Sequence, residues 1–132
     1  MKLLCATLFA LVGFSTARAD DTFESLTEEG IKALNGFAEI LITIKDKATA
    51  ERAKPDIKKV AEQIGGLKER MEKLGEPGRL RKEELDKKYT PKMEATIKKI
   101  NKELDRIKDL EGGSLIVTQV TAILDLAPKA KK

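Results

Sequence analysis

The stretch TAERAKPDIKKVAEQIGGLKERMEKL, residues 49–74, decides the fold of this chain. Its apolar residues follow one another at alternating steps of three and four positions, without a break. They are Ala50, Ala53, Ile57, Val60, Ile64, Leu67, Met71 and Leu74. This alternation places them on one face of an α-helix and is typical of helices that pack side by side, as in a coiled coil. Thr49 is a suitable N-cap and Gly75 a suitable end, so we predict a long helix over these residues.

Two more long helices are predicted on either side of this one. Residues 23–47 carry apolar residues mostly at helical spacing. Within them the segment GFAEILITI, residues 36–44, is apolar nearly all round, so this half of the helix needs partners on several sides. Residues 79–110 carry a third apolar stripe and end at two glycines. The sequence therefore predicts three long helices in a row.

A short fourth helix is predicted in LIVTQVTAILDLA, residues 115–127. Its many β-branched residues leave a strand open as an alternative. A single strand would have no sheet partner, however, so we predict a helix. The complete fold class is all-α: an antiparallel up-down bundle of three long helices plus a short C-terminal fourth helix.

The expected packing follows from the short connections between the helices. Folding the second helix back on the third places Ile64 opposite Tyr89. Folding the first helix on the second places Leu26 near Met71. We expect the fourth helix to lie against residues 36–44, because that would explain why this half of the first helix is apolar all round. Since the fourth helix is short, we also expect an open groove beside Leu26 and Ile31.

A structural joint between the second and third helices is the main expected feature of this packing. We expect the Tyr89 ring to cover Gly65 and Gly66, whose place inside a helix costs about 1 kcal/mol each relative to alanine. Pro91 would either kink the third helix or, with a cap at Thr90, begin a new one. Pro55 leaves the same two alternatives open for the second helix. We interpret this group as packing rather than as a binding site.

The beginning of the chain has the features of a secretory signal. A short basic start precedes an apolar run over residues 3–14, too short to span a bilayer as a helix. Ala17 and Ala19 then fit the small-x-small cleavage pattern. We therefore predict a cleaved signal peptide over residues 1–19, with an uncleaved membrane anchor as the alternative. Residues 20–127 would form one helical domain and residues 128–132 a basic disordered tail, in the periplasm or outside the cell.

The charge and the missing residue types exclude most chemistry. Without Lys2 and Arg18 of the signal, the 26 basic side chains fall to 24, against 22 acidic ones. The chain has no histidine, and its single cysteine, Cys5, lies in the signal. These residues are the usual zinc ligands and nucleophiles, and helical di-iron sites also need histidine. We therefore expect no enzyme activity, no metal and no cofactor.

One basic cluster is a weak candidate for binding an anionic surface. It consists of Lys98, Lys99, Lys102 and Arg106. Acidic residues interrupt it, so a solvated helix face is the preferred interpretation. No aromatic residues alternate with the lysines, so we expect no nucleic-acid partner. The nearly balanced charge also argues against membrane-surface binding, which needs a strongly basic amphipathic helix.

Three segments resemble a group of small secreted bacterial proteins of unknown function. They are TIKDKATAERAKPDIKKV at residues 43–60, LGEP at residues 74–77 and ELDKKYTPKM at residues 84–93. The resemblance covers roughly residues 40–95. It implies an exported helical protein with two recurring proline positions, and it implies no activity.

The functional expectation is an exported, non-enzymatic helical protein of the cell envelope. It would act through protein–protein interaction or a structural role, with a protein partner or self-association. The alternative is a periplasmic holdase-type chaperone, which would present an apolar groove to unfolded clients. Binding to lipid or to a membrane surface is a third, less favoured alternative.

Overall fold

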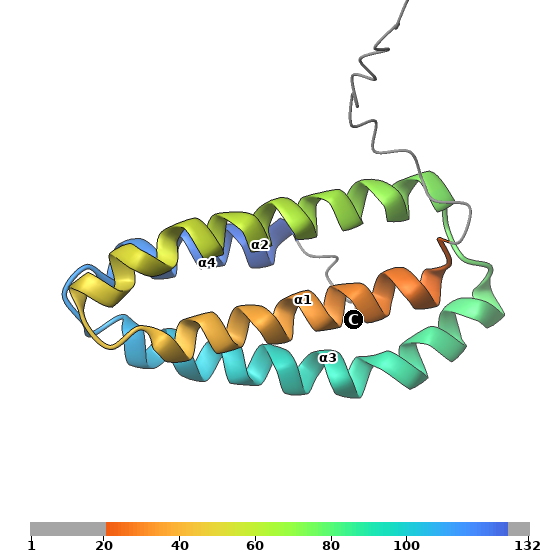
Figure 1. Cartoon of the computed structure of the whole chain (residues 1–132). Coiled ribbons are helices and arrows are strands. Elements are labelled where there is room, and N and C mark those ends of the chain that lie inside the picture. The colour runs from red at the N-terminus through yellow and green to blue at the C-terminus, as the bar shows by residue number, and fades with distance from the viewer. Residues whose placement is uncertain (1–20, 127–132) are drawn as a thin grey trace, which may run out of the picture.

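The computed structural model describes residues 21–126, which form four α-helices. They are α1 (Phe23–Thr43), α2 (Lys47–Leu74), α3 (Arg79–Ile107) and α4 (Gly113–Leu126). Consecutive helices run in alternating directions along one bundle (Figure 1). The predicted fold class, an up-down bundle of three long helices and a short fourth one, is confirmed. The predicted cleavage residues Ala17 and Ala19 and the predicted tail lie outside the described residues.

The order of neighbours around the bundle differs from the prediction. α1 packs between α2 and α3, and α4 packs against α2 and α3 on the other side (Figure 1). Within residues 21–126, no Cα atom of α2 lies within 8 Å of α3, and none of α1 within 8 Å of α4. The predicted pairing of Ile64 with Tyr89 is therefore wrong, as is the predicted place of α4 against residues 36–44.

The physical reason for this order of neighbours lies in α1, which is apolar on two sides. Its buried residues are Leu26, Ala33, Leu34, Phe37, Ala38 and Leu41. α2 and α3 each carry one apolar stripe, so each can bury that stripe against a different side of α1. The second apolar side of residues 36–44 is therefore covered by a long helix rather than by α4.

Contacts between side chains fix the register of α1 with both neighbours. Arg70 of α2 binds Asp21 and Glu29 at the start of α1, which agrees with the predicted antiparallel register. α1 and α3 instead run parallel (Figure 1). Tyr89 donates a hydrogen bond to Glu28, and Thr96 of α3 donates one to Asn35 of α1; in both pairs the partners are 61 positions apart.

The expected joint between α2 and α3 does not form. A Cβ atom added to Gly65 or Gly66 would meet nothing within 4 Å, so no ring covers them. Tyr89 is 3 % exposed, but it donates its hydroxyl to Glu28 of α1 at 2.7 Å. The correction follows from the neighbour order, because α1 separates α2 from α3.

Both prolines lie inside continuous helices. α2 continues through Pro55 and α3 continues through Pro91, so neither proline begins a new helix. Figure 1 shows α3 as a single curved helix. α2 begins at Lys47, earlier than predicted, because two reciprocal hydrogen bonds cap it at Asp46. The Thr49 amide donates to the Asp46 carboxylate, and the Asp46 amide donates to the Thr49 hydroxyl oxygen. Thr49 is therefore the third helical residue of a capping box, and the prediction that it is the N-cap is wrong.

Candidate functional site

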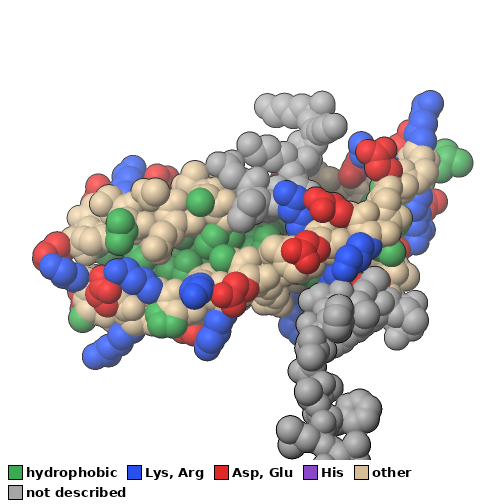
Figure 2. Space-filling model, turned by 90° about the horizontal axis from the view of Figure 1, so that it is seen from above, with side chains coloured by type: hydrophobic (Ala, Val, Ile, Leu, Met, Phe, Trp, Pro, Cys, Tyr) green, Lys and Arg blue, Asp and Glu red, His purple; other side chains and the backbone are tan. Residues whose placement is uncertain are grey.

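An open groove of about 660 Å³ runs between α2 and α4. Its lining residues come from both helices: Glu51, Lys54, Pro55, Ile57, Lys58, Ala61, Gln119, Ala122 and Ile123. Figure 2 looks onto this side of the bundle and shows hydrophobic side chains in a hollow flanked by charged ones. We call this feature the α2–α4 groove and consider it the candidate functional site.

Two glycines after α3 place α4 beside α2. Gly112 has a φ of +80°, a conformation that favours glycine. At Gly113 a Cβ atom would lie 1.8 Å from the carbonyl oxygen of Ile107, so a side chain is excluded by backbone. This close approach lets the chain turn within residues 108–112, so that α4 begins at Gly113 and returns along the bundle parallel to α2 (Figure 1).

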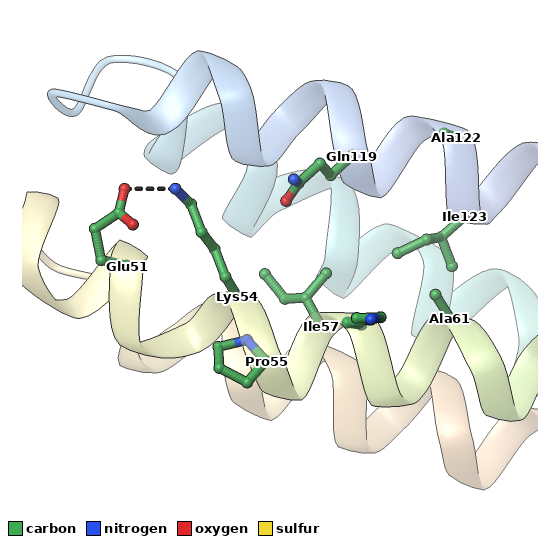
Figure 3. A pocket seen from close by; sticks show the side chains of 9 residues that line it. Glu51, Lys54, Pro55, Ile57, Ala61, Gln119, Ala122 and Ile123 are labelled. Carbon is green, nitrogen blue, oxygen red and sulfur yellow. Dashed lines mark hydrogen bonds and ion pairs between the residues drawn. The ribbon is translucent and has the colours of Figure 1, made fainter.

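The floor of the α2–α4 groove is apolar and belongs to the core. Ile57 is 2 % exposed and Ile123 is 5 % exposed, and both extend into the space between the two helices (Figure 3). Ala61 and Ala122 flank them with small side chains, which leaves the space above the floor open. The groove therefore offers apolar contact without a cavity that closes around a ligand.

The α2 wall of the groove carries its charges. Lys54 donates to Glu51 at 2.5 Å, a pair that lies along the groove mouth (Figure 3). Lys58 is 79 % exposed, and its nearest acidic partner, Glu62, is 4.0 Å away. An exposed pair at that distance contributes little, so the Lys58 ammonium is free to meet another anion.

The α4 wall is uncharged. From Gly113 to Ile123 the helix has no acidic or basic residue, although 36% of the whole chain is charged. The exposed residues of this stretch are Ser114, Leu115, Thr118, Gln119, Thr121 and Ala122. Leu115 is 54 % exposed. Depletion of charge on an exposed helix face is the composition that distinguishes the centre of protein interfaces.

Pro55 is the only residue of the expected joint that lies in this site. It is exposed on the groove wall, and its ring nitrogen has no hydrogen to donate to the Glu51 carbonyl. That carbonyl therefore lacks its usual helical partner beside the groove. The other joint residues do not converge with it: Tyr89 and Pro91 belong to α3, while Gly65 and Gly66 lie beyond the groove on α2.

The predicted basic cluster is divided by the structure. The Arg106 guanidinium donates to the carbonyl oxygens of Ile44 at 2.7 Å and Leu41 at 3.0 Å, and to the Glu103 carboxylate. Arg106 therefore caps the end of α1, which the sequence pattern did not predict. Lys98, Lys99 and Lys102 remain exposed on α3.

Leu26 and Ile31, beside which a groove is predicted, do not line the α2–α4 groove. Leu26 is 1 % exposed and belongs to the core, and Ile31 is half-buried. Leu26 is close to the end of α1 where Arg70 binds Asp21 and Glu29. The hydrogen bonds to these two carboxylates, with Asp21 having the larger effect, raise the pKa of Arg70 above its ordinary value.

Further features bear on what the described residues can do. In residues 21–126 no three acidic, histidine or cysteine side chains are grouped to hold a metal ion. None of the described helices is long and apolar enough to cross a membrane.

Comparison with protein-family models, curated proteins and solved structures finds no match to this chain. The resemblance to small secreted bacterial proteins stays a prediction.

Proposed function

We propose that this is an exported, non-enzymatic helical protein of the cell envelope that binds another protein in its α2–α4 groove. The observation that carries the proposal is the combination of an apolar floor with an uncharged, exposed α4 wall. The rest of this surface is rich in charged residues, so an exposed helix face without any charge needs another explanation than solubility.

The groove chemistry supports binding more than catalysis. Its one carboxylate, Glu51, is engaged by Lys54, and its remaining polar side chains are Lys58 and Gln119. No general base is held against a nucleophile there, which is the arrangement that acid–base or covalent catalysis requires. Apolar side chains at helical spacing along two helices match the way grooves receive a helix from a partner.

Site-specific photo-crosslinking in the cells that make the protein tests this function. A photoreactive residue replaces Ala122 in the groove, or Lys99 on the exposed face of α3 as the control. We expect a discrete protein adduct from position 122 and none from position 99. Fractionation of the same cells tests export, which predicts the adduct in the envelope. Equal, diffuse labelling from both positions would contradict a dedicated binding surface.

A periplasmic holdase-type chaperone is the second candidate, because an open apolar groove also suits unfolded segments. It predicts that the protein suppresses aggregation of a model client at equimolar amounts, and that Ala122→Arg abolishes the effect. No suppression even at large excess would remove this candidate. It would leave the dedicated-partner proposal intact.

A further inference from the structure

We propose that the occupant of the α2–α4 groove is an amphipathic helix of a partner protein, with an acidic flank facing α2, that runs antiparallel to α2 and α4. This inference rests on the function proposed above and specifies the partner's chemistry. It follows from the length, the charge and the polarity of the groove.

The length of the groove suits a short helix. Its lining on α2 extends from Glu51 to Ala61, which is about 15 Å at 1.5 Å per residue. Ile57 and Ala61 of α2 are one helical turn apart, and Ala122 and Ile123 face them from α4 (Figure 3). A partner helix of about three turns would place apolar residues at every three to four positions over this floor.

The charge of the groove distinguishes its two sides. The α2 wall carries two cations, Lys54 and Lys58, and one anion, Glu51, which already binds Lys54. Lys58 pairs with Glu62 only at 4.0 Å, and because both side chains are exposed this pair contributes little. The facing α4 wall is neutral. A complementary helix therefore needs carboxylates on the flank that faces α2 and uncharged residues on the flank that faces α4.

The direction of the occupant follows from the parallel arrangement of α2 and α4. Both helices have their N-termini at the same end of the groove (Figure 1). The Asp46 carboxylate already occupies the N-cap of α2, whereas α4 has no acidic residue in its first turn, so the N-terminus of α4 is the one open to a partner. Helix dipoles place partial positive charge at that end, so a partner helix is stabilised when its C-terminus lies there. That orientation is antiparallel to both.

Pro55 adds a polar determinant to the same wall. The Glu51 carbonyl lacks its usual helical donor, the N–H four residues on, because Pro55 has no N–H. A serine, threonine, asparagine or glutamine on the partner's acidic flank would supply that donor. The resulting hydrogen bond would fix the partner's position along the groove.

The same charges argue against a second copy of this chain as the occupant. A second copy that docked through its own α4 would offer Lys58 no carboxylate, because residues Gly113 to Ile123 include none. Two copies related by a twofold axis would bring either a neutral α4 or another cationic α2 wall against Lys54 and Lys58. Self-association is therefore an outcome that the test must separate from the proposal.

Binding of designed peptides tests the inference directly. Two fluorescent peptides of about four helical turns share one leucine and alanine face and differ only in flanks of glutamate or lysine. The full chain is expressed in bacterial cells and purified in the form they produce, and binding is followed by fluorescence anisotropy. We expect the acidic peptide to bind at least about tenfold more tightly than the basic one.

Three variants locate the binding. Lys58→Glu should abolish or reverse the preference for the acidic peptide. Ala122→Arg should abolish binding of both peptides, since it fills the groove. Lys99→Glu, the matched charge reversal on α3, should change nothing. Circular dichroism checks that each variant keeps the helical content of the parent.

Several results would overturn the inference. Equal binding of the two peptides, or no effect of Lys58→Glu, would remove the charge argument. Dimers by sedimentation that Ala122→Arg dissociates would assign the groove to a second copy. Ala122-dependent flotation with phosphatidylglycerol vesicles would assign it to lipid. A crosslinked partner segment without acidic residues would overturn the inference but keep the proposed binding function.

Discussion

The two ends of the bundle are held together in different ways. At the end where α4 is present, four helices enclose side chains that are fully buried: Ile44, Ile107, Ile116 and Val120. At the other end α4 is missing; Leu26 is still buried there, and polar contacts also join α1 to its neighbours. Arg70 binds Asp21 and Glu29, Arg81 binds Glu24, and Tyr89 binds Glu28.

The difference follows from the number of helices that share each end. Four helices surround an apolar centre, so large aliphatic side chains lose nearly all contact with water. At the three-helix end no Cα atom of α2 lies within 8 Å of α3, so the two helices are joined there by the connection over residues 75–78 and by their packing against α1. Charged and polar side chains that cross from α2 and α3 to α1 then supply a larger share of the contacts. We therefore expect the four-helix end to dominate stability and the three-helix end to depend on specific ion pairs.

Truncation of the four-helix core should have the largest effect. Ile116 is fully buried, so Ile116→Ala should lower the free energy of unfolding by about 3 kcal/mol. Its neighbour Leu115 is 54 % exposed, and Leu115→Ala should cost below about 0.5 kcal/mol. Urea unfolding followed by circular dichroism compares the two. Equal losses would mean that α4 is not docked through the face that the structure buries.

The turn that begins α4 should be nearly as sensitive. Gly113→Ala places a methyl group against the Ile107 carbonyl, and the required backbone shift should cost about 2 kcal/mol. Gly66→Ala is the matched control, because its added methyl meets nothing within 4 Å. It should instead stabilise α2 by about 0.5–1 kcal/mol through helix propensity. Urea unfolding of both variants gives the sign of the change in the free energy of unfolding. That sign distinguishes a backbone clash from an effect of helix propensity. Stabilisation by Gly113→Ala would contradict the close approach of Gly113 to Ile107.

The three-helix end should respond to loss of Arg70. Arg70→Ala leaves Asp21, whose side chain is 4 % exposed, without its guanidinium and should cost about 1.5–2 kcal/mol. Arg79, which is 91 % exposed, provides the control, and Arg79→Ala should cost below about 0.5 kcal/mol. The same unfolding measurement compares them. If the two substitutions cost the same, ion pairs do not hold this end.

The smallest expected effect concerns pH at the α1–α2 connection. The Thr49 amide, and then its hydroxyl, donate to Asp46 and lower its pKa below the usual 3.8. A lowered folded pKa means that this contribution to stability is present above the unfolded pKa and is lost as pH falls through the folded one. Asp46→Asn should therefore lower the unfolding temperature near neutral pH and flatten its decline below about pH 4. An unchanged decline, measured by thermal unfolding, would show that the cap does not titrate with folding.

Little of the candidate site could be predicted from local sequence pattern. Pro55 was singled out for its backbone effect, but its place on a groove wall depends on α4, which lies more than fifty positions later in the chain. One signal was present: the uncharged run from Gly112 to Leu124 in a highly charged chain. Arg106 could not have been assigned to the end of α1, because the residues around an arginine in the sequence do not indicate which distant carbonyl groups it will bind.

The sequence by itself determined the helices and which face of each is buried. Residues 49–74 have an unbroken helical alternation, and Gly75 ends this helix as predicted. The third helix ends at Ile107, before the two glycines that were predicted to end it. These signals are local, because a helix forms from neighbouring residues and its apolar stripe is set by their spacing. The three long helices and the short fourth one were therefore predictable.

Only the tertiary structure decided which stripes meet. An apolar stripe shows that a helix face must be buried, but it does not show against which helix. Here α1 is apolar on two sides and packs against both α2 and α3. Arg70 and Arg106 acquire partners on α1 from that arrangement alone. The α2–α4 groove exists for the same reason, since its walls come together only when the whole bundle is assembled.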